Sequence, residues 1–167
     1  MNVQEFNTQL HEFCRTMNEL STTPWNIIKD EIGEYARQIC GISTPEGEIL
    51  NRDVYIVYSE TYRVPVLWFN FFRQDGRPIL IDDLKKVLKN LENEPTSSLL
   101  SRMSHGEHPH LGVLYYNIHP CNTNNVMNQL KSDENFIARW MSIYGPDIGI
   151  SIPLEYFACI SSKNQKI

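Results

Sequence analysis

Residues 54–72 read VYIVYSETYRVPVLWFNFF, and this stretch decides the fold. Two runs within it, VYIVY at 54–58 and VPVLWFNFF at 64–72, are dense in β-branched and aromatic residues, which are enriched in strands. The residues between the runs, SETYR, form a short polar connection. We therefore predict that the two runs are antiparallel neighbours in one sheet.

Further strand signals lie on both sides of this stretch. Residues 33–42, GEYARQICGI, are predicted to form the first strand, followed by a turn over TPEG at 44–47. An apolar run at 111–118 predicts another strand, whereas 92–110 read as a polar loop. The strands are therefore expected to form an antiparallel meander.

Three segments have the spacing of amphipathic helices. Residues 3–20 carry apolar side chains at steps of three and four, which places them on one face. This stripe comprises Val3, Phe6, Leu10, Phe13, Met17 and Leu20. A second helix is predicted to begin at the acidic pair 82–83, and a third to cover 134–144. A helix, then strands, then helices indicate the α+β class.

The whole chain reads as one domain over residues 1–167, with 160–167 expected to be a frayed tail. A content of 41% hydrophobic and 21% charged residues is typical of a globular protein with its own core. The net charge of −5 argues against a general nucleic-acid binder, which usually carries a basic face. Neither a membrane-spanning run nor a secretory signal is recognisable, so we expect a cytoplasmic protein.

The chain has four cysteines, Cys14, Cys40, Cys121 and Cys159, and no C-x-x-C pair. In a reducing cytosol, such widely spaced cysteines are expected to be free thiols rather than disulfides or zinc ligands. Cys14 lies beside the apolar stripe of the first helix and Cys40 within a predicted strand, so both are expected to be core residues. Cys159 fits either the core or the surface.

Cys121 differs from the others because an apolar run delivers it into a polar, loop-like segment, HPCNTNN at 119–125. Pro120 fixes its own φ and restricts His119, so the backbone just before the thiol is stiff. A thiol of ordinary pKa, ~8.5, can exchange with an activated thioester. Cys121 is therefore our candidate nucleophile, with His119 and Pro120 in structural roles. The alternative is a cysteine that happens to lie in a loop.

Two other side chains are candidates for the same site. If the chain stays extended, Asn117 projects to the same side as residues 119 and 121, where its carboxamide could donate to an oxyanion. It could equally well end a strand. Tyr62 lies in the connection between the two strongest strands, where it either faces solvent or leans over a neighbouring site.

Three histidines, His105, His108 and His110, lie within six residues of one another, with Glu107 between them. Such a cluster can bind a metal. However, the spacing is neither helical nor of a zinc type, and Pro109 interrupts it. We therefore predict no metal site.

The segment YNIHPCNTNNVM at 116–127, preceded by YSETYRVPVLWFNFF at 58–72 and followed by a helix with Trp140, resembles the autophagy-specific ubiquitin-like conjugating (E2-type) enzymes. The specific part is His-Pro-Cys followed by Asn-Asn-Val-Met at 124–127. The resemblance extends in order over residues 50–157. It implies an E2-like α+β fold with an N-terminal helix, an antiparallel meander and C-terminal helices.

The family has two branches, and the chain length favours one of them. One branch attaches its modifier to a lipid and carries a large acidic insertion, which this sequence lacks. The short branch joins the ubiquitin-like autophagy-related protein 12 to a lysine of autophagy-related protein 5. The resemblance therefore favours the short branch, although Asn-Val-Met after the cysteine is closer to the lipid branch.

The resemblance also implies a mechanism. Cys121 would accept the modifier's C-terminal glycine from a thioester on the activating enzyme, and a lysine of an acceptor protein would then attack the new thioester. General ubiquitin-conjugating enzymes place a His-Pro-Asn motif before their cysteine. That motif is absent here, so Asn117 is our candidate for its amide, and Tyr62 matches a family tyrosine that would position the lysine.

The resemblance implies three partners: the modifier, its activating enzyme and the acceptor protein. It requires no cofactor, and any recruitment to the pre-autophagosomal membrane would occur through these partners. Two other functions stay open. A cysteine hydrolase would need a distant histidine near Cys121, for which His11 and the histidines at 105–110 are the candidates. A non-catalytic E2-like module would use the sheet for protein contacts.

Overall fold

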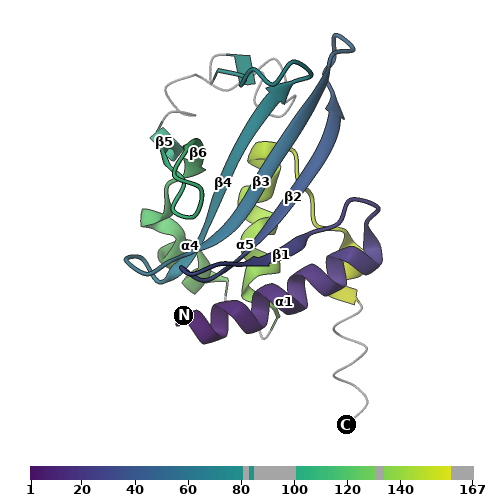
Figure 1. Ribbon diagram of the computed structural model, residues 1–167. Helices are drawn as coiled ribbons and strands as arrows, with labels where there is room; N and C mark the ends of the chain where they lie inside the picture. The colour runs from purple at the N-terminus through teal and green to yellow at the C-terminus, as the bar shows by residue number, and fades with distance from the viewer. Residues whose placement is uncertain (81–82, 85–100, 131–133, 159–167) are drawn as a thin grey trace.

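Six strands form one antiparallel sheet in the order β1-β2-β3-β4-β6-β5 (Figure 1). The computed structural model describes residues 1–80, 83–84, 101–130 and 134–158. The strands are β1 (Asn26–Lys29), β2 (Glu34–Ser43), β3 (Ile49–Ser59), β4 (Val64–Arg73), β5 (Met103–Glu107) and β6 (Leu114–Ile118). The helical elements are α1 (Val3–Leu20), the 3-10 turn η2 (Pro120–Asn122), α4 (Thr123–Gln129), α5 (Phe136–Tyr144) and the 3-10 turn η3 (Gly145–Ile148). The predicted α+β class is confirmed.

Strands β3 and β4 form the centre of the sheet, and their register runs from Leu50 opposite Arg73 to Ser59 opposite Val64. Because strand side chains alternate between faces, one face of this hairpin carries its apolar residues toward the helices. The buried side chains of that face are Leu50, Val54, Ile56, Leu67, Phe69 and Phe71. The predicted pairing of the two strongest strands is therefore confirmed.

Helix α1 begins at a capping box. The Asn2 side chain accepts a hydrogen bond from the backbone N–H of Glu5, and the Glu5 carboxylate accepts one from the backbone N–H of Asn2, both at 2.9 Å. These two bonds satisfy donors that the first turn of a helix leaves free. The predicted stripe is buried at Phe6, Leu10, Phe13 and Met17. The helix therefore packs on the sheet along the face that its sequence predicts.

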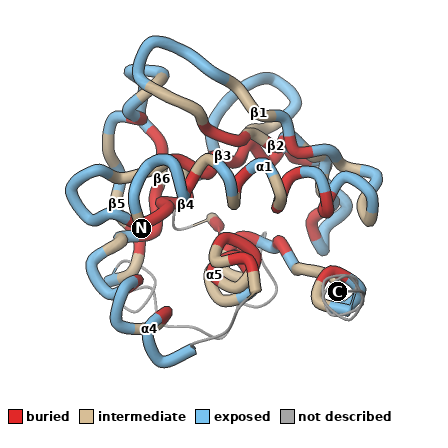
Figure 2. Tube along the Cα trace, turned by 90° about the horizontal axis from the view of Figure 1, so that it is seen from below, coloured by how far each residue is buried: buried red, intermediate tan, exposed pale blue. Residues whose placement is uncertain are grey.

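Helix α5 lies on the same side of the sheet as α1 (Figure 2). Asn135 caps α5 by accepting from the backbone N–H of Ala138 at 3.1 Å, and it donates to the Gln9 carbonyl of α1 at 2.9 Å. One side chain thus begins α5 and fixes it against α1. Trp140 and Met141 of α5 are buried in the shared core.

None of the helices in the described residues combines the length and apolar character that would be needed to cross a membrane. Helix α1 is long enough at 18 residues, but it is amphipathic, with a polar face away from the sheet. Its apolar stripe serves the core instead.

On the opposite, outer face of the sheet, a buried carboxylate is the centre of a hydrogen-bond network. Asp53 of β3 accepts two hydrogen bonds from the Arg37 guanidinium, each at 2.9 Å. It also accepts from the hydroxyls of Tyr55 and Tyr115, at 3.2 and 2.9 Å. Burial, followed by the nearby carboxylate, raises the pKa of Tyr55 to about 12, and the hydrogen bonds to Asp53 raise the pKa of Arg37. Both groups keep their protons at neutral pH, so this network joins β2, β3 and β6.

The turn between β5 and β6 covers the middle of this outer face. His108 in that turn is fully buried, and its ring lies 4.6, 5.3 and 5.5 Å from those of Tyr55, Trp68 and Tyr115. Its Nδ1 accepts a hydrogen bond from the backbone N–H of His110 at 3.2 Å. Burial lowers the pKa of His108 to about 4, so the ring is neutral at physiological pH. A neutral His108 therefore anchors the turn on the sheet.

Three strand predictions were wrong in detail. The segment predicted as the first strand, 33–42, is the second strand, β2. The first strand, β1, was not predicted because its four residues, NIIK, are too few to show a pattern. Strand β3 begins at Ile49 rather than 54. The prediction started too late because the charged Arg52 and Asp53 interrupt the apolar pattern, although both are buried in the structure. Within the predicted loop at 92–110, Met103–Glu107 form β5 because their backbone pairs with β6.

The other predicted boundaries fall as follows. The turn at 44–47 is confirmed by the hydrogen bond from the Thr44 N–H to the Glu48 carbonyl, at 2.8 Å. The predicted helix at 134–144 is α5. The helix predicted from 82–83 is helical at 83–84, and the rest of it lies outside the described residues, as do the predicted tail 160–167 and Cys159.

We expect acid to destabilise the protein through His108. The pKa of His108 falls from 6.5 to about 4 on folding, so its contribution is complete above pH 6.5 and is lost as pH falls toward 4. The full difference corresponds to about 3 kcal/mol. Urea unfolding at pH 7.5, 5.5 and 4.5 measures this, with a His108→Gln variant as the comparison.

The free energy of unfolding should fall less steeply with pH in His108→Gln than in the wild type. A His105→Gln variant is the matched control, because His105 is exposed. Parallel pH profiles for the wild type and His108→Gln would contradict the placement of His108.

Candidate active site

Cys121 lies three residues after the end of β6. The backbone N–H of His119 donates to the Arg102 carbonyl at 2.8 Å, which holds the chain beside the segment before β5. Pro120 then begins the 3-10 turn η2, and the backbone N–H of Cys121 donates to His119 Nδ1 at 3.2 Å. The thiol-bearing residue is exposed. Residues 119–122 therefore form a hydrogen-bonded turn and residues 123–125 begin α4, so the segment is not the loop that the sequence predicted.

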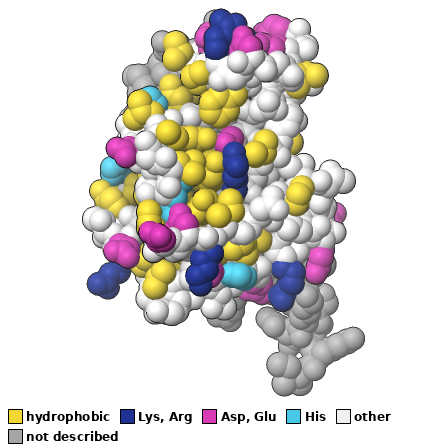
Figure 3. Space-filling view, in the orientation of Figure 1, with side chains coloured by type: hydrophobic (Ala, Val, Ile, Leu, Met, Phe, Trp, Pro, Cys, Tyr) yellow, Lys and Arg dark blue, Asp and Glu magenta, His cyan; other side chains and the backbone are white. Residues whose placement is uncertain are grey.

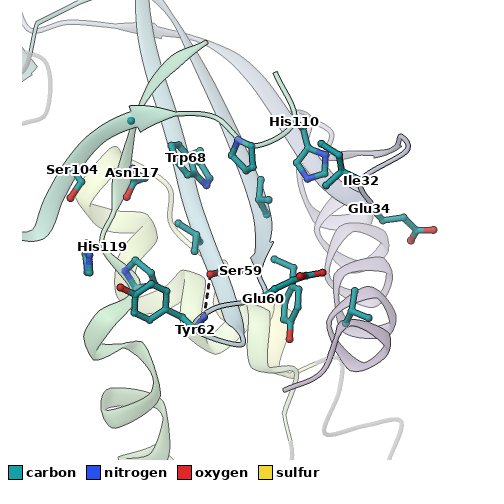
Figure 4. Close-up of a pocket in the computed structure, with 18 of the residues that line it drawn as sticks. Ile32, Glu34, Ser59, Glu60, Tyr62, Trp68, Ser104, His110, Asn117 and His119 are labelled. Atoms are coloured by element: carbon teal, nitrogen blue, oxygen red, sulfur yellow. Dashed lines mark hydrogen bonds between the residues drawn. The ribbon is translucent and has the colours of Figure 1, made fainter. Parts of the chain in front are cut away.

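The turn that joins β3 to β4 lies beside Cys121's segment and carries Tyr62. The backbone N–H of Arg63 donates to the Ser59 carbonyl at 2.7 Å, and that of Tyr62 donates to Ser59 Oγ at 3.3 Å (Figure 4). The Asn124 amide of α4 donates to the Tyr62 carbonyl at 3.2 Å. The Tyr62 ring meets the His119 ring edge-on, with centroids 5.7 Å apart. Two contacts therefore fasten this turn to the segment that carries the thiol.

A pocket of about 640 Å³ opens on the outer face of the sheet between these segments. Tyr62, Asn117, His119 and Pro120 line it near Cys121, and Trp68 of β4 lines its wall. Figure 4 shows the side chains of Tyr62, Asn117 and His119 around one end of this space. A space of this volume can hold side chains of a protein substrate.

The structure thus brings Tyr62, Asn117, His119 and Pro120 together in the lining of one pocket, and Cys121 follows Pro120 just outside that lining. Asn117 is buried, is paired with Ser104 of the neighbouring strand β5, and lines the pocket. The alternation used to select Asn117 holds for residues 117 and 119, which both line the pocket. It ends at Pro120, so Cys121 is reached by a turn and not by an extended strand. The roles assigned to Asn117 and Tyr62 stay predictions.

The three described cysteines have different surroundings. Cys14 is buried, as predicted, and burial raises its pKa to about 12. Cys40 is only partly buried, and its thiol donates to the Gly41 carbonyl at 3.3 Å, so the prediction of a core residue was wrong in part. Cys121 is exposed. Of these three thiol-bearing residues, Cys121 is the most exposed.

Each of the histidines at 105–110 is engaged by other side chains of the protein. His105 stacks on Tyr116, with ring centroids 4.6 Å apart, and His110 Nδ1 lies 2.8 Å from Asp30 Oδ2. His108 is enclosed by aromatic rings. Among the residues that the structure describes, no three His, Cys, Asp or Glu side chains are placed to hold one metal ion. The arrangement serves packing and holds the turn between β5 and β6.

Two contributors to the site escaped the sequence analysis. The contact of Asn124 was not predicted: its amide reaches the Tyr62 carbonyl 62 residues earlier in the chain. Trp68 was read only as a strand residue, although the alternation of β4 already placed it on the face opposite Leu67 and Phe69. The alternation could have identified Trp68. No sequence signal pairs Asn124 with Tyr62.

The family model for "Autophagocytosis associated protein, active-site domain" matches residues 27–155. The chain belongs to this family. It is 30% identical over 128 residues to the ubiquitin-like-conjugating enzyme ATG10 of Homo sapiens, covering 72% of this chain and 58% of the human protein. It is also 30% identical over 128 residues to ATG10 of Arabidopsis thaliana, covering 68% of this chain and 56% of that protein. The chain thus spans a little over half the length of these relatives.

The fold also matches a solved structure, described as the crystal structure of the autophagic E2, Atg10. The TM-score is 0.59 at 19% sequence identity, over 89% of this chain and 97% of that one. The match shows that this chain has the same fold. The predicted resemblance to autophagy-specific conjugating enzymes, and within them to autophagy-related protein 10, is therefore confirmed.

We expect iodoacetamide to modify Cys121 well before Cys14. Cys121 is exposed, whereas Cys14 is buried with a pKa of about 12 and therefore forms little thiolate. Brief alkylation of the folded protein, followed by mass spectrometry of its peptides, measures both rates. Cys121→Ala serves as the control that identifies the fast site. Equal rates at the two thiols would contradict this placement.

Proposed function

We propose that this protein is an E2-type acyltransferase that carries a ubiquitin-like modifier as a thioester on Cys121. The observation that supports the proposal most is an exposed thiol, held by a proline-stiffened turn, beside a pocket lined by Tyr62, Asn117 and His119. Membership of the family and the fold shared with Atg10 support the same reading. The chemistry needs neither a metal nor an organic cofactor.

In the first step, the Cys121 thiolate attacks the carbonyl carbon of the thioester between the modifier's C-terminal glycine and a cysteine of the activating enzyme. The new carbon–sulfur bond forms at Cys121, and the cysteine of the activating enzyme leaves as a thiolate. The bond formed is of the same kind as the bond broken, so the step needs an accessible thiol more than a strong base. The exposure of Cys121 meets this requirement.

In the second step, a lysine ε-amine of the acceptor attacks the thioester on Cys121. An isopeptide bond forms as the carbon–sulfur bond breaks, and the proton lost by the amine balances the departing Cys121 thiolate, which becomes a thiol. We assign Asn117 to stabilise the oxyanion of the tetrahedral intermediate, a role that is worth ~3 kcal/mol in comparable sites. We assign Tyr62 to position the lysine, because its turn lies against His119 at the entrance to the pocket.

For the partners, we propose autophagy-related protein 12 as the modifier and a lysine of autophagy-related protein 5 as the acceptor. The relatives named ATG10 support this choice over the lipid-conjugating branch. We further propose that the protein acts in the cytoplasm and reaches the pre-autophagosomal membrane through its partners. Assays with each branch's modifier distinguish the two branches directly.

We expect the wild type, incubated with activating enzyme, modifier and ATP, to form an adduct that a thiol reductant removes. Cys121→Ser should instead form an adduct that resists the reductant but is cleaved by base, because an oxyester replaces the thioester. Non-reducing gels before and after each treatment measure both adducts.

The matched control is Cys40→Ser. It should leave the adduct unchanged, because the Cys40 thiol is hydrogen-bonded to the Gly41 carbonyl within β2. If the wild type forms no reductant-sensitive adduct, the chain is a binding module. If it cleaves a modifier–peptide fusion instead, the chain is a hydrolase.

We expect Asn117→Ala to slow discharge from Cys121 to lysine about 100-fold, because one oxyanion donor is lost. Tyr62→Phe should slow discharge about tenfold, because the ring stays in place against His119 while the hydroxyl is lost. Charging of Cys121 should change less than threefold in both. Single-turnover charging and discharge, followed separately, measure the two steps.

Asn51→Ala, an exposed amide of the same sheet, is the matched control for Asn117→Ala. Urea unfolding of each variant tests for damage to the fold. Equal loss of charging and discharge would contradict the assigned roles.

A further inference from the structure

The turn between β3 and β4, which carries Tyr62, ends in a residue with an uncommon backbone conformation. Arg63 has a φ of 54°, and it is the one residue other than glycine with a positive φ in the part of the chain that the structure describes. This left-handed conformation brings Cβ close to the following carbonyl oxygen, so residues with a side chain seldom adopt it. It persists only where surrounding contacts enforce it, and such residues cluster at functional sites.

Contacts from two distant segments enforce this conformation. The Asn124 amide of α4 donates to the Tyr62 carbonyl, and the Met1 nitrogen donates to the Arg63 carbonyl, both at 3.2 Å. Within the turn, the backbone N–H of Arg63 donates to the Ser59 carbonyl at 2.7 Å. Two successive carbonyls of the turn are therefore each bonded to a donor 62 residues away in the chain.

The Tyr62 side chain is held less firmly than its backbone. It is 39% exposed, and the one ring that it contacts among the described residues is that of His119. Val66 and Trp68 line the same pocket as Tyr62, and Figure 3 shows hydrophobic side chains gathered over the middle of the outer face of the sheet. A Tyr62 ring released from His119 would remove apolar surface from water by turning into this pocket. The place of the ring therefore depends on how the backbone of the turn is held.

We infer that Asn124 is a positioning residue for the transfer step. Its bond to the Tyr62 carbonyl enforces the left-handed conformation of Arg63 and keeps the Tyr62 ring beside His119 and out of the pocket. His119 in turn accepts a hydrogen bond from the backbone N–H of Cys121, so one series of contacts leads from α4 through the turn to the thiol-bearing residue. This inference rests on the proposed function, in which Tyr62 acts on discharge.

The alternative role for Asn124 is direct donation to the oxyanion. Its amide lies outside the lining of the pocket and is already bonded to a carbonyl, whereas Asn117 lines the pocket. The geometry therefore favours the positioning role. The two roles differ in one measurable respect, because positioning requires the Tyr62 ring and direct donation does not.

The test follows charging of Cys121 and its discharge to lysine in single turnovers. Asn124→Ala should slow discharge about fivefold, the effect of losing one hydrogen bond, and change charging less than about twofold. In a Tyr62→Ala background, Asn124→Ala should cause no further loss, because the ring that it positions is gone. Asn128→Ala is the matched control and should discharge at the wild-type rate, because Asn128 is another exposed amide of α4, one turn further along.

A rescue experiment uses the left-handed residue. In the Asn124→Ala protein, Arg63→Gly should restore discharge about threefold, because glycine adopts a positive φ without a steric penalty. Arg63→Ala is the matched control: it removes the same charged side chain but keeps the penalty, so it should restore nothing.

Three results would overturn the inference. The first is a wild-type discharge rate in Asn124→Ala, and the second is a full fivefold loss when Asn124→Ala is added to Tyr62→Ala. The third is an Arg63→Gly rescue no larger than that of Arg63→Ala.

A further measurement needs no charged Cys121. In NMR spectra of the free protein, the ring protons of Tyr62 and His119 should give an NOE in the wild type and in Asn128→Ala, and a much weaker one in Asn124→Ala. If the NOE depends on Asn124 while Cys121 accepts no modifier, the proposed function fails and the hold of Asn124 on Tyr62 stands. If Cys121 is charged and discharged while Asn124→Ala keeps the full NOE, the inference fails and the proposed function stands.

Discussion

In the central hairpin, ten residues of β3 pair with ten of β4 in a single register. That pairing decides which side chains face the helices and which lie on the outer face of the sheet. Side chains alternate along each strand, so a slip of one residue would exchange the two faces. Val54 and Ile56 would leave the helices, and Asp53 would be buried against them without its partners. The same register fixes the turn between the strands and therefore the position of Tyr62. One backbone pairing thus sets the core and one wall of the pocket.

The outer face of the sheet is ordered by polar bonds where the inner face is ordered by apolar packing. Asp53 accepts four hydrogen bonds, which use the acceptor capacity of a carboxylate almost completely. A buried charge with fewer partners would be costly, and removing any one donor would expose that cost. With this network and His108 in place, the outer face holds its shape with no helix of the described chain packed on it, and the pocket stays open.

The sequence predicted the elements whose signal is local and missed those that depend on pairing. The stripe of α1 and the apolar runs of β3 and β4 are local patterns; α1 and β4 lie where they were predicted, and β3 contains its predicted run but begins five residues earlier. The sequence of β5, MSHGE, has no such pattern, and it forms a strand because its backbone pairs with β6. His108 looked like one member of a metal cluster, and only the packing of Tyr55, Trp68 and Tyr115 around it accounts for its place.

The candidate site divides in the same way. His-Pro-Cys was recognisable because it belongs to a short continuous motif that resembles the conjugating enzymes, and its proline restricts the backbone just before the thiol. The contacts that assemble the site, from Asn124 to the Tyr62 carbonyl and from Tyr62 to the His119 ring, join residues more than fifty positions apart. For the proposed reaction these long-range contacts are decisive, because exchange between thioesters has little intrinsic driving force and amide formation requires an aligned amine. In this reading the thiol can stay exposed, while the hairpin register and α4 supply the alignment that the chemistry needs.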